Sequence, residues 1–226
     1  MTFSLLAADP DTGEIGMVIS SSSPAVAARC AYVRAGVGVA ASQNVTDPRL
    51  GPALLDALAA DGEPGAALAR VRAGANHVEH RQLAVLDPAG RGAAWSGSRA
   101  LGIDGVRFGG DSVAAGNLLA RVEVLDALID GFRDATGTLP ARLVAAAMAG
   151  VAAGGEAGPL HSAGLLVARD VPWPVIDLRV DHSEDPVADL EDLWALYEPL
   201  SEDYLIRALD PDRAPAYGVA GEAARR

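Results

Sequence analysis

The sequence predicts a layered α+β fold in which antiparallel sheets are covered by pairs of helices. Blocks of short apolar strands alternate with blocks of helices, whereas single βαβ units would alternate strand by strand. Asp-Pro and Gly-rich turns separate neighbouring strands, which favours hairpins. Half of the 226 residues are hydrophobic but only 4% are aromatic, so a core of domain size must be built largely from small side chains.

The first hairpin is the clearest element. Residues 3–7 form a short apolar run that is typical of a buried strand, and residues 15–19 return as its partner. The turn at residues 9–13 contains Pro, Asp and Gly, each of which favours a tight reversal for its own physical reason. Four serines, residues 20–23, follow the second strand and end at Pro24.

The next strand is predicted over residues 34–42, where Gly36 and Gly38 indicate the close approach of another backbone. The later strands are expected at residues 81–86, 92–96, 113–117, 162–167 and 175–180. Residues 97–110 are rich in glycine and are expected to form a loop.

Helical spacing of apolar residues locates the helices. They are expected at residues 50–60, 65–72, directly after residue 117, and at 139–153, 186–197 and 201–209. The sandwich is therefore expected to span residues 1–182, and residues 183–226 are expected to form a C-terminal helical extension with a loosely held tail.

Charge and composition exclude several functions. The net charge of −12 argues against nucleic acid and anionic membranes as partners. Every basic residue is Arg, which excludes lysine Schiff-base chemistry and a Walker-type phosphate lysine. Cys30 is the only cysteine, so neither a disulfide framework nor a multi-cysteine zinc site is expected. Because the sequence shows neither a secretory signal nor a membrane span, we expect a cytoplasmic protein. We also expect no cofactor.

Thr2 is the first residue with a catalytic interpretation. Removal of Met1 would place an α-amine and a hydroxyl on one residue at the mouth of the buried hairpin. An α-amine has a pKa of roughly 7.7–8.0, which suits a base at neutral pH. This is the N-terminal threonine form of a nucleophile paired with its base. The simpler interpretation is that Thr2 only begins a strand.

Several motifs, in order along the chain, resemble a family of bacterial proteins of unknown function, DUF1028. The resemblance rests on residues 2–4, 21–29, 34–38, 41–44, 47–52, 81–83, 96–98 and 115–119. This family is grouped with the N-terminal-nucleophile (Ntn) hydrolases. The resemblance therefore implies a four-layer αββα sandwich, with the first hairpin inside and its N-terminus at the cleft.

The resemblance also shows where this chain departs from active Ntn hydrolases of the proteasome type. Those enzymes carry an Asp after the second strand and a Lys at the start of the next one. Here Ser21 or Ser22 stands near the first position, and Arg29 or Arg34 is the nearest cation to the second. Serine lacks the charge of a carboxylate, and Arg stays protonated, although it can hold a substrate carboxylate in a two-pronged contact.

The remaining site candidates are polar residues at strand ends. Asn117 has two interpretations, an oxyanion donor or the cap of the following helix. Ser21 is expected to support catalysis beside Thr2. The backbone N–H groups of the serine run suit an anion. Candidate substrate-binding residues are Ser22, Ser23, Arg29, Arg34, Gln43 and Asn44.

The leading hypothesis is an Ntn-type amidohydrolase that cleaves a small amide bearing an acidic group. A non-catalytic protein that binds small molecules on the same scaffold is the alternative. A third hypothesis, a metal hydrolase using His77 and His80, lacks a further ligand, and no metal is expected. Self-association as a homodimer through the apolar face of the helix at residues 186–197 is also expected.

Overall fold

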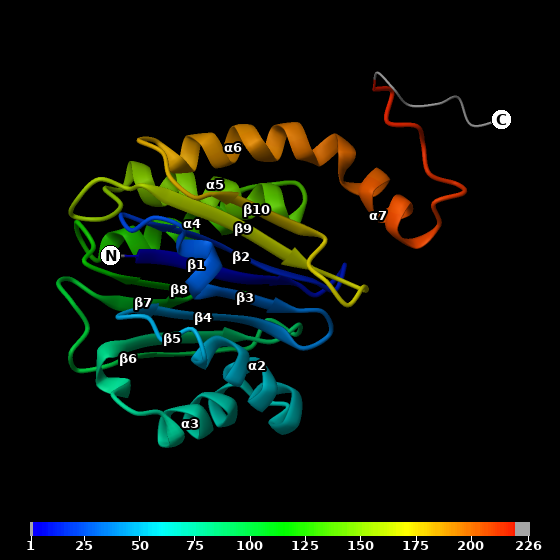
Figure 1. Cartoon of the computed structure of the whole chain (residues 1–226). Helices are drawn as coiled ribbons and strands as arrows, with labels where there is room; N and C mark the ends of the chain where they lie inside the picture. The colour runs from blue at the N-terminus through cyan, green and yellow to red at the C-terminus, as the bar shows by residue number, and fades with distance from the viewer. Residues whose placement is uncertain (1, 220–226) are drawn as a thin grey trace.

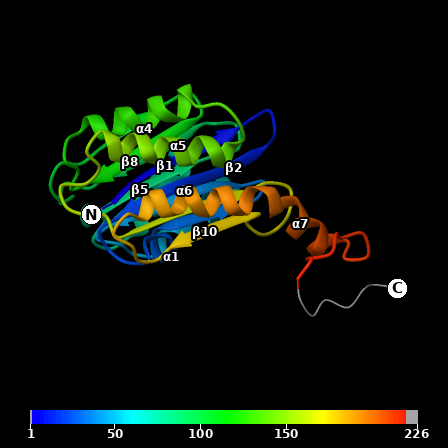
Figure 2. The ribbon, with the colours of Figure 1, turned by 90° about the horizontal axis from the view of Figure 1, so that it is seen from above.

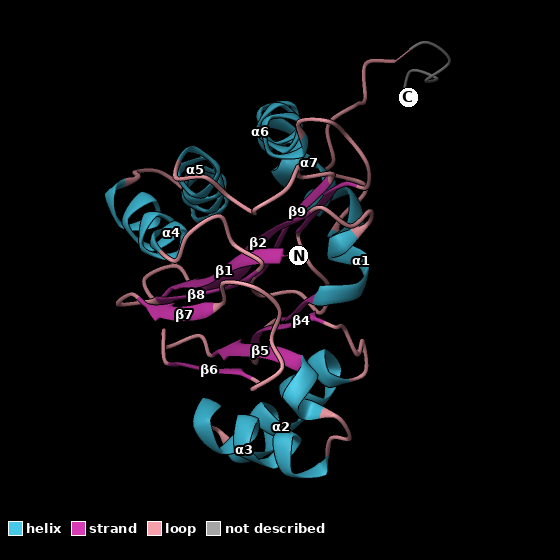
Figure 3. Cartoon of the chain, turned by 90° about the vertical axis from the view of Figure 1, so that its left-hand side faces the viewer, coloured by secondary structure: helices cyan, strands magenta, loops and turns pink. Residues whose placement is uncertain are grey.

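The computed structural model describes residues 2–219, and in it two antiparallel sheets face each other with helices on both outer faces (Figure 1, Figure 3). The larger sheet has the strand order β10-β9-β2-β1-β8-β7. Its strands are β1 (Thr2–Asp9), β2 (Glu14–Ser21), β7 (Gly105–Phe108), β8 (Ser112–Asn117), β9 (Ser162–Ala168) and β10 (Ile176–Val180). The first hairpin thus provides the two central strands of this sheet, as expected from its apolar sequence.

The smaller sheet has the order β3-β4-β5-β6 and comes from one continuous segment. Its strands are β3 (Ala31–Arg34), β4 (Gly38–Asn44), β5 (Arg81–Leu86) and β6 (Gly92–Ser96). Helices α2 (Leu50–Asp61) and α3 (Pro64–Gly74) cover its outer face, and a 3₁₀ turn at Val78–His80 leads into β5. The hairpin of β5 and β6 and both helices lie where the sequence predicts them.

Three helices lie side by side over the outer face of the larger sheet (Figure 2). They are α4 (Glu123–Asp134), α5 (Leu139–Ala152) and α6 (Pro186–Tyr197). Strand β1 shows how alternation divides the core: Phe3 and Leu5 pack under the helices, whereas Leu6 packs between the sheets. Since Thr2 has the same parity as Leu6, its side chain is directed toward the space between the sheets.

The layer between the sheets combines many alanines with larger aliphatic side chains, and none of its buried residues is aromatic. Its buried alanines are Ala8, Ala27, Ala31, Ala41, Ala84, Ala115 and Ala168. Gly164 is part of the same close packing, because a Cβ atom there would collide with Ala27 on helix α1 (Val26–Cys30). Small side chains therefore allow close packing in this layer.

Two predicted boundaries are wrong. The strand expected at residues 34–42 is in fact β3 and β4, joined by a turn in which Gly36 has φ +69°. Gly38 does lie against another backbone, because an added Cβ would be 2.6 Å from the carbonyl oxygen of Leu86. The expected loop at residues 97–110 contains the edge strand β7. Short strands of mixed polarity such as β7 carry little periodic signal.

The helix expected directly after Asn117 begins later, at Glu123 with Val122 as its N-cap residue. Asn117 ends β8, and Leu118, with φ +51°, turns the chain out of the sheet. The helix-cap interpretation of Asn117 is therefore wrong. The five-residue helix α1, which follows the serine run, was also missed.

The C-terminal helices differ in how they are held. In α6 the side chains of Val187, Leu190 and Trp194 are buried in the same cluster as α5, so the face expected to form a homodimer is covered within the chain. A 3₁₀ turn at Glu198–Leu200 leads to α7 (Ser201–Leu209), which buries none of its residues.

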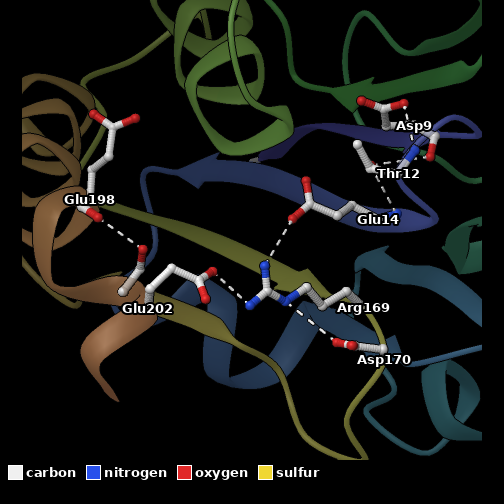
Figure 4. A network of polar contacts seen from close by, with 8 residues as sticks. Asp9, Thr12, Glu14, Arg169, Asp170, Glu198 and Glu202 are labelled. Carbon is white, nitrogen blue, oxygen red and sulfur yellow. Dashed lines mark hydrogen bonds and ion pairs between the residues drawn. The ribbon is translucent and has the colours of Figure 1, made fainter. Parts of the chain in front are cut away.

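Helix α7 is tied to the sheet by ion pairs of Arg169, which follows β9 (Figure 4). The guanidinium is 2.7 Å from Glu202 on α7, 3.4 Å from Asp170 and 4.0 Å from Glu14 on β2. Burial raises the pKa of Glu14, while the charge of Arg169 lowers it. No helix within residues 2–219 is long and apolar enough to cross a membrane.

Candidate functional site

The three residues predicted to be catalytic converge at one end of the larger sheet. Thr2 is the first residue of β1 and lies opposite Asn117 on β8, while Ser21 ends the neighbouring strand β2. The Thr2 hydroxyl donates a hydrogen bond of 3.4 Å to the hydroxyl of Ser21. Thr2 is only 4% exposed and Ser21 and Asn117 are buried, so the group is sheltered from solvent. The predicted removal of Met1 lies outside the described residues.

The serine run binds an anion, and the anion is a side chain of this protein. The Ser22 backbone N–H donates to both carboxylate oxygens of Glu156, each at 3.2 Å. The Ser23 N–H donates to the Ser21 hydroxyl at 3.0 Å. The Ser162 hydroxyl fixes the loop further by donating to the Ser23 carbonyl at 2.6 Å. The loop N–H groups thus have internal partners in this state.

Glu156 lies against the candidate site, and the sequence reasoning missed it. It lies between α5 and β9, forms a β-bridge with Leu119 and is 5% exposed. Burial raises the pKa of its carboxyl group to about 7, although the positive charge of the chain terminus and hydrogen bonds from Ser22 act in the opposite direction. A carboxyl group with this pKa exchanges protons near neutral pH.

The sequence contained a signal for Glu156. Between Arg142 and Arg169 it is the only residue with a formal charge at neutral pH, in a segment of Ala, Gly, Leu and Val. A single acidic residue in such a segment is rarely buried unless a partner compensates its charge. The partners lie in the serine run, more than a hundred residues earlier in the chain, so spacing alone does not connect them.

Asn117 belongs to a buried chain of amides that links the two sheets. Ser4 donates to Gln43 at 2.9 Å, Gln43 donates to Gln82 at 2.8 Å, and Asn117 donates to the same Gln82 oxygen at 3.1 Å. Gln82 itself donates to the carbonyl oxygen of Gly116 at 2.9 Å. Because a carbonyl can only accept, this last bond fixes the direction of the whole chain.

The orientation of the Gln82 amide determines which atom of the Asn117 side chain is left without a hydrogen bond. Its amide nitrogen donates to Gln82, and its Oδ1 atom is buried without a hydrogen-bond partner among the described residues. A buried acceptor without a hydrogen bond lowers the stability of the folded state, unless a ligand or another group donates to it in some functional state. The geometry therefore favours Asn117 as an acceptor, whereas the sequence suggested an oxyanion donor.

Gln43 and Asn44 have structural partners. Gln43 is fully buried between Ser4 and Gln82. Asn44 adopts φ +72°, donates to the His80 carbonyl at 2.7 Å and accepts from the Leu101 N–H at 3.3 Å. Both residues were predicted to bind substrate. The structure places Gln43 in the amide chain that reaches Asn117, whereas Asn44 holds the end of β4 against His80 and Leu101.

The two arginines named as anion holders lie in different places. Arg29, on α1, follows the serine run and donates to the Pro24 carbonyl at 2.7 Å. Arg34 lies opposite Gly38, at the end of β4 remote from Gln43, and forms a 2.8 Å ion pair with Asp56. The structure therefore brings Arg29 near the serine run but does not bring Arg34 to the site.

The region around His77 and His80 does not provide the ligands that the metal hypothesis requires. Across residues 2–219, no group of three or more His, Cys, Asp or Glu side chains is arranged to hold a metal ion. The His80 ring lies 3.3 Å from Arg99, and Glu79 accepts hydrogen bonds from the N–H and hydroxyl of Ser98. These contacts explain the cluster of polar residues around His77 as local loop structure.

The chain matches one family over most of its length. The model of a family described as "Family of unknown function (DUF1028)" matches residues 2–190. The crystal structure of protein SPO2555 from Silicibacter pomeroyi, described as DUF1028, is similar with a TM-score of 0.81 and 32% identity. The match covers 87% of this chain and 88% of that one. No curated protein matches the chain. The chain belongs to the DUF1028 family.

Proposed function

We propose that this protein is an Ntn-type hydrolase that cleaves the amide bond of a small molecule, with Thr2 as the nucleophile after removal of Met1. The observation that carries the proposal is the placement of Thr2. Thr2 begins a central strand, and its hydroxyl contacts Ser21. The next residue of the serine run, Ser22, donates its backbone N–H to the Glu156 carboxylate. The resemblance of the sequence to DUF1028, a family grouped with the Ntn hydrolases, supports the same assignment.

In the proposed reaction the α-amine of Thr2 accepts the proton of the Thr2 hydroxyl, directly or through one water. The hydroxyl oxygen attacks the amide carbonyl and forms a tetrahedral intermediate. The ammonium then returns its proton to the leaving nitrogen as the C–N bond breaks, which leaves an ester on Thr2. A water molecule, activated by the same amine, attacks the ester and regenerates the hydroxyl.

Three neighbours support the amine and the hydroxyl of Thr2 in the proposal. The Glu156 carboxylate, ionised above a pKa of about 7, stabilises the ammonium form that the reaction creates. The Oδ1 atom of Asn117, which has no partner within residues 2–219, accepts a hydrogen bond from the amine. The Ser21 hydroxyl holds the Thr2 hydroxyl in position. Glu156 thus supplies the carboxylate that serine cannot supply at the position after the second strand.

The proposed substrate is a small amide, because the layer between the sheets is closely packed. Of the two arginines predicted to hold an acidic group of the substrate, Arg29 remains in the proposal, since Arg34 is paired with Asp56. Binding without turnover is the alternative function. The low exposure of Thr2 supports it, because a buried hydroxyl is poorly accessible to a substrate carbonyl.

The sequence allows an unusually direct test. It contains no lysine, so the α-amine is the only aliphatic primary amine of the chain. Intact-mass measurement first establishes whether Met1 is removed. A β-lactone probe should then add once to the purified protein and map to Thr2. Thr2→Ala should abolish the adduct, whereas Thr12→Ala, in the exposed turn between β1 and β2, should retain it.

Turnover is tested separately by release of amine from a panel of small amides. The proposal expects release by the wild-type protein and by Thr12→Ala, and none by Thr2→Ala. Retention of Met1 in the native protein, or equal release by Thr2→Ala, would refute the mechanism. Saturable binding of an amide without release would establish the binding protein instead.

A further inference from the structure

A cavity lies at the opposite end of the larger sheet from Thr2. Strand β8 runs from Ser112, opposite Ala7, to Asn117, opposite Thr2. Five steps of about 3.4 Å separate these ends, so the two places are roughly 17 Å apart. The cavity has a volume of about 430 Å³ and lies between the turn joining β7 to β8 and the helices α4 and α5. None of its lining residues takes part in the candidate hydrolase site.

The cavity contains one cation whose charge is not balanced. The Arg142 guanidinium rests on the ring of Phe132, with its central carbon 4.0 Å from the ring centroid, and its Nε donates to the Phe132 carbonyl at 3.4 Å. Among residues 2–219 no carboxylate forms an ion pair with Arg142. Its two terminal nitrogens carry donors in the planar geometry that matches a carboxylate.

Two further charged side chains, Arg133 and Asp111, line the cavity. Arg133 is paired with Asp134 at 2.8 Å and with Asp130 at 2.5 Å. The side chain of Asp111 packs against Gly90, where an added Cβ would lie 3.2 Å from the Asp111 Cβ and 3.3 Å from its Oδ1. Asp111 therefore lies over the turn between β5 and β6. Arg142 remains as the group available to an anion.

The walls of the cavity are apolar. Ile129 and Phe132 on α4 line it, and Phe108 at the end of β7 is 58% exposed beside it. A large aromatic side chain with this exposure gains stability when a ligand covers it. Gly109 keeps this region open, because an added Cβ would meet the Ser112 hydroxyl and the Ile129 side chain.

We propose that this cavity binds a small monocarboxylate with an aromatic or branched apolar body. The carboxylate is held by the two terminal nitrogens of Arg142, and the apolar body lies between Phe108 and Ile129. Such a ligand would pair its carboxylate with the Arg142 guanidinium and cover the exposed Phe108 ring at the same time. The stacking of Arg142 on Phe132 holds the guanidinium in place before the ligand arrives.

The test uses the full-length protein with phenylacetate as the probe and the neutral phenylacetamide as its matched control. Calorimetric titration should give phenylacetate an affinity at least about tenfold higher than phenylacetamide, because a charge-assisted pair is lost in the amide. In amide NMR spectra, phenylacetate should shift the Gly109 and Gly110 signals. Absence of binding at about 10 mM phenylacetate, or shifts located elsewhere, would overturn the proposal.

Two variants locate the interaction. Arg142→Met keeps an unbranched side chain over Phe132 but removes the charge, and should weaken phenylacetate binding roughly ten- to a hundredfold. Arg133→Met, at the paired neighbour, should leave the affinity within about twofold. Equal weakening by both variants would overturn the proposal. If Arg142→Met does not fold, Phe108→Ala, at an exposed position, takes its place and should weaken binding severalfold; unchanged affinity there would refute the assignment.

Discussion

The carboxylate of Glu156 receives the backbone N–H of Ser22 on both of its oxygens, each at 3.2 Å, although 134 residues separate the two in the chain. This contact joins the end of β2 to the loop before β9. It also places a carboxyl group with a pKa of about 7 beside the start of β1. The free energy of unfolding should therefore change with pH as Glu156 titrates.

Replacing Glu156 with Gln should flatten the pH dependence of stability. The folded state raises the pKa of Glu156 from 4.5 to about 7, so between these values the folded state binds more protons than the unfolded state. Stability should fall as pH rises through this window, by up to about 3 kcal/mol, and stay low above it. Urea unfolding across the window measures the effect. Glu191→Gln, exposed on α6, should keep the wild-type slope; an unchanged slope in Glu156→Gln would contradict the assignment.

Replacing Gln82 with Leu should destabilise the fold by about 2–4 kcal/mol, because several buried polar groups lose their partner together. Gln82 accepts from Gln43 and Asn117 and donates to the Gly116 carbonyl and the Ser96 hydroxyl. Chemical denaturation measures the loss. Ser96→Ala, which removes one of these bonds, should cost only about 1 kcal/mol. Equal costs for the two variants would mean that the network does not act as a unit.

Adding a methyl group at Gly164 should displace α1 and cost about 1–3 kcal/mol. The new Cβ would collide with Ala27 on α1 and lie 3.3 Å from the Leu178 carbonyl. Amide NMR shifts in α1 and thermal unfolding together measure the change. Gly74→Ala at the end of α3, where nothing lies within 4 Å, should be neutral or stabilising by up to about 1 kcal/mol. Wild-type spectra for Gly164→Ala would show that the contact is not tight.

Replacing Arg169 with Met should release α7 without unfolding the sandwich. Arg169 contacts Glu14 and Glu202, and α7 buries none of its own residues. Hydrogen exchange of the α7 amides should become faster, whereas β1 and β2 should keep their protection. Arg213→Met, whose ion pair with Asp210 is exposed, should leave α7 unchanged. Unaltered exchange in Arg169→Met would show that other contacts hold the helix.

Much of the fold could be predicted because its central elements carry strong local signals. The β1–β2 hairpin combines two apolar runs with a Pro-Asp-Gly type turn, and α5 combines helical periodicity with Pro140 in its first turn. The errors occur where local signals are weak or are overridden. Gly36 forms a turn that divides one apparent strand into two, and β7 becomes a strand only because β8 lies beside it.

The site was predicted only in part for a similar reason. Thr2 was identified from the α-amine and hydroxyl that removal of Met1 would place on one residue. Ser21 was identified from the resemblance to a known family, and Asn117 from its position at the end of a predicted strand. Glu156 and Gln82 depend on partners far away in the sequence, which no periodic pattern reveals. The direction of the Asn117 amide is set by the Gly116 carbonyl through Gln82, and this requires coordinates.

The whole of the smaller sheet lies within residues 31–96, whereas the larger sheet assembles strands from residues 2–21, 105–117 and 162–180. On the ribosome, the smaller sheet can therefore form as soon as its own segment has emerged. The β1–β2 hairpin must wait with both edges open until β8 and β9 have been translated. Chaperones that shield unpaired apolar strands should consequently bind nascent chains at this hairpin, and a chain that stops before β9 should remain their client.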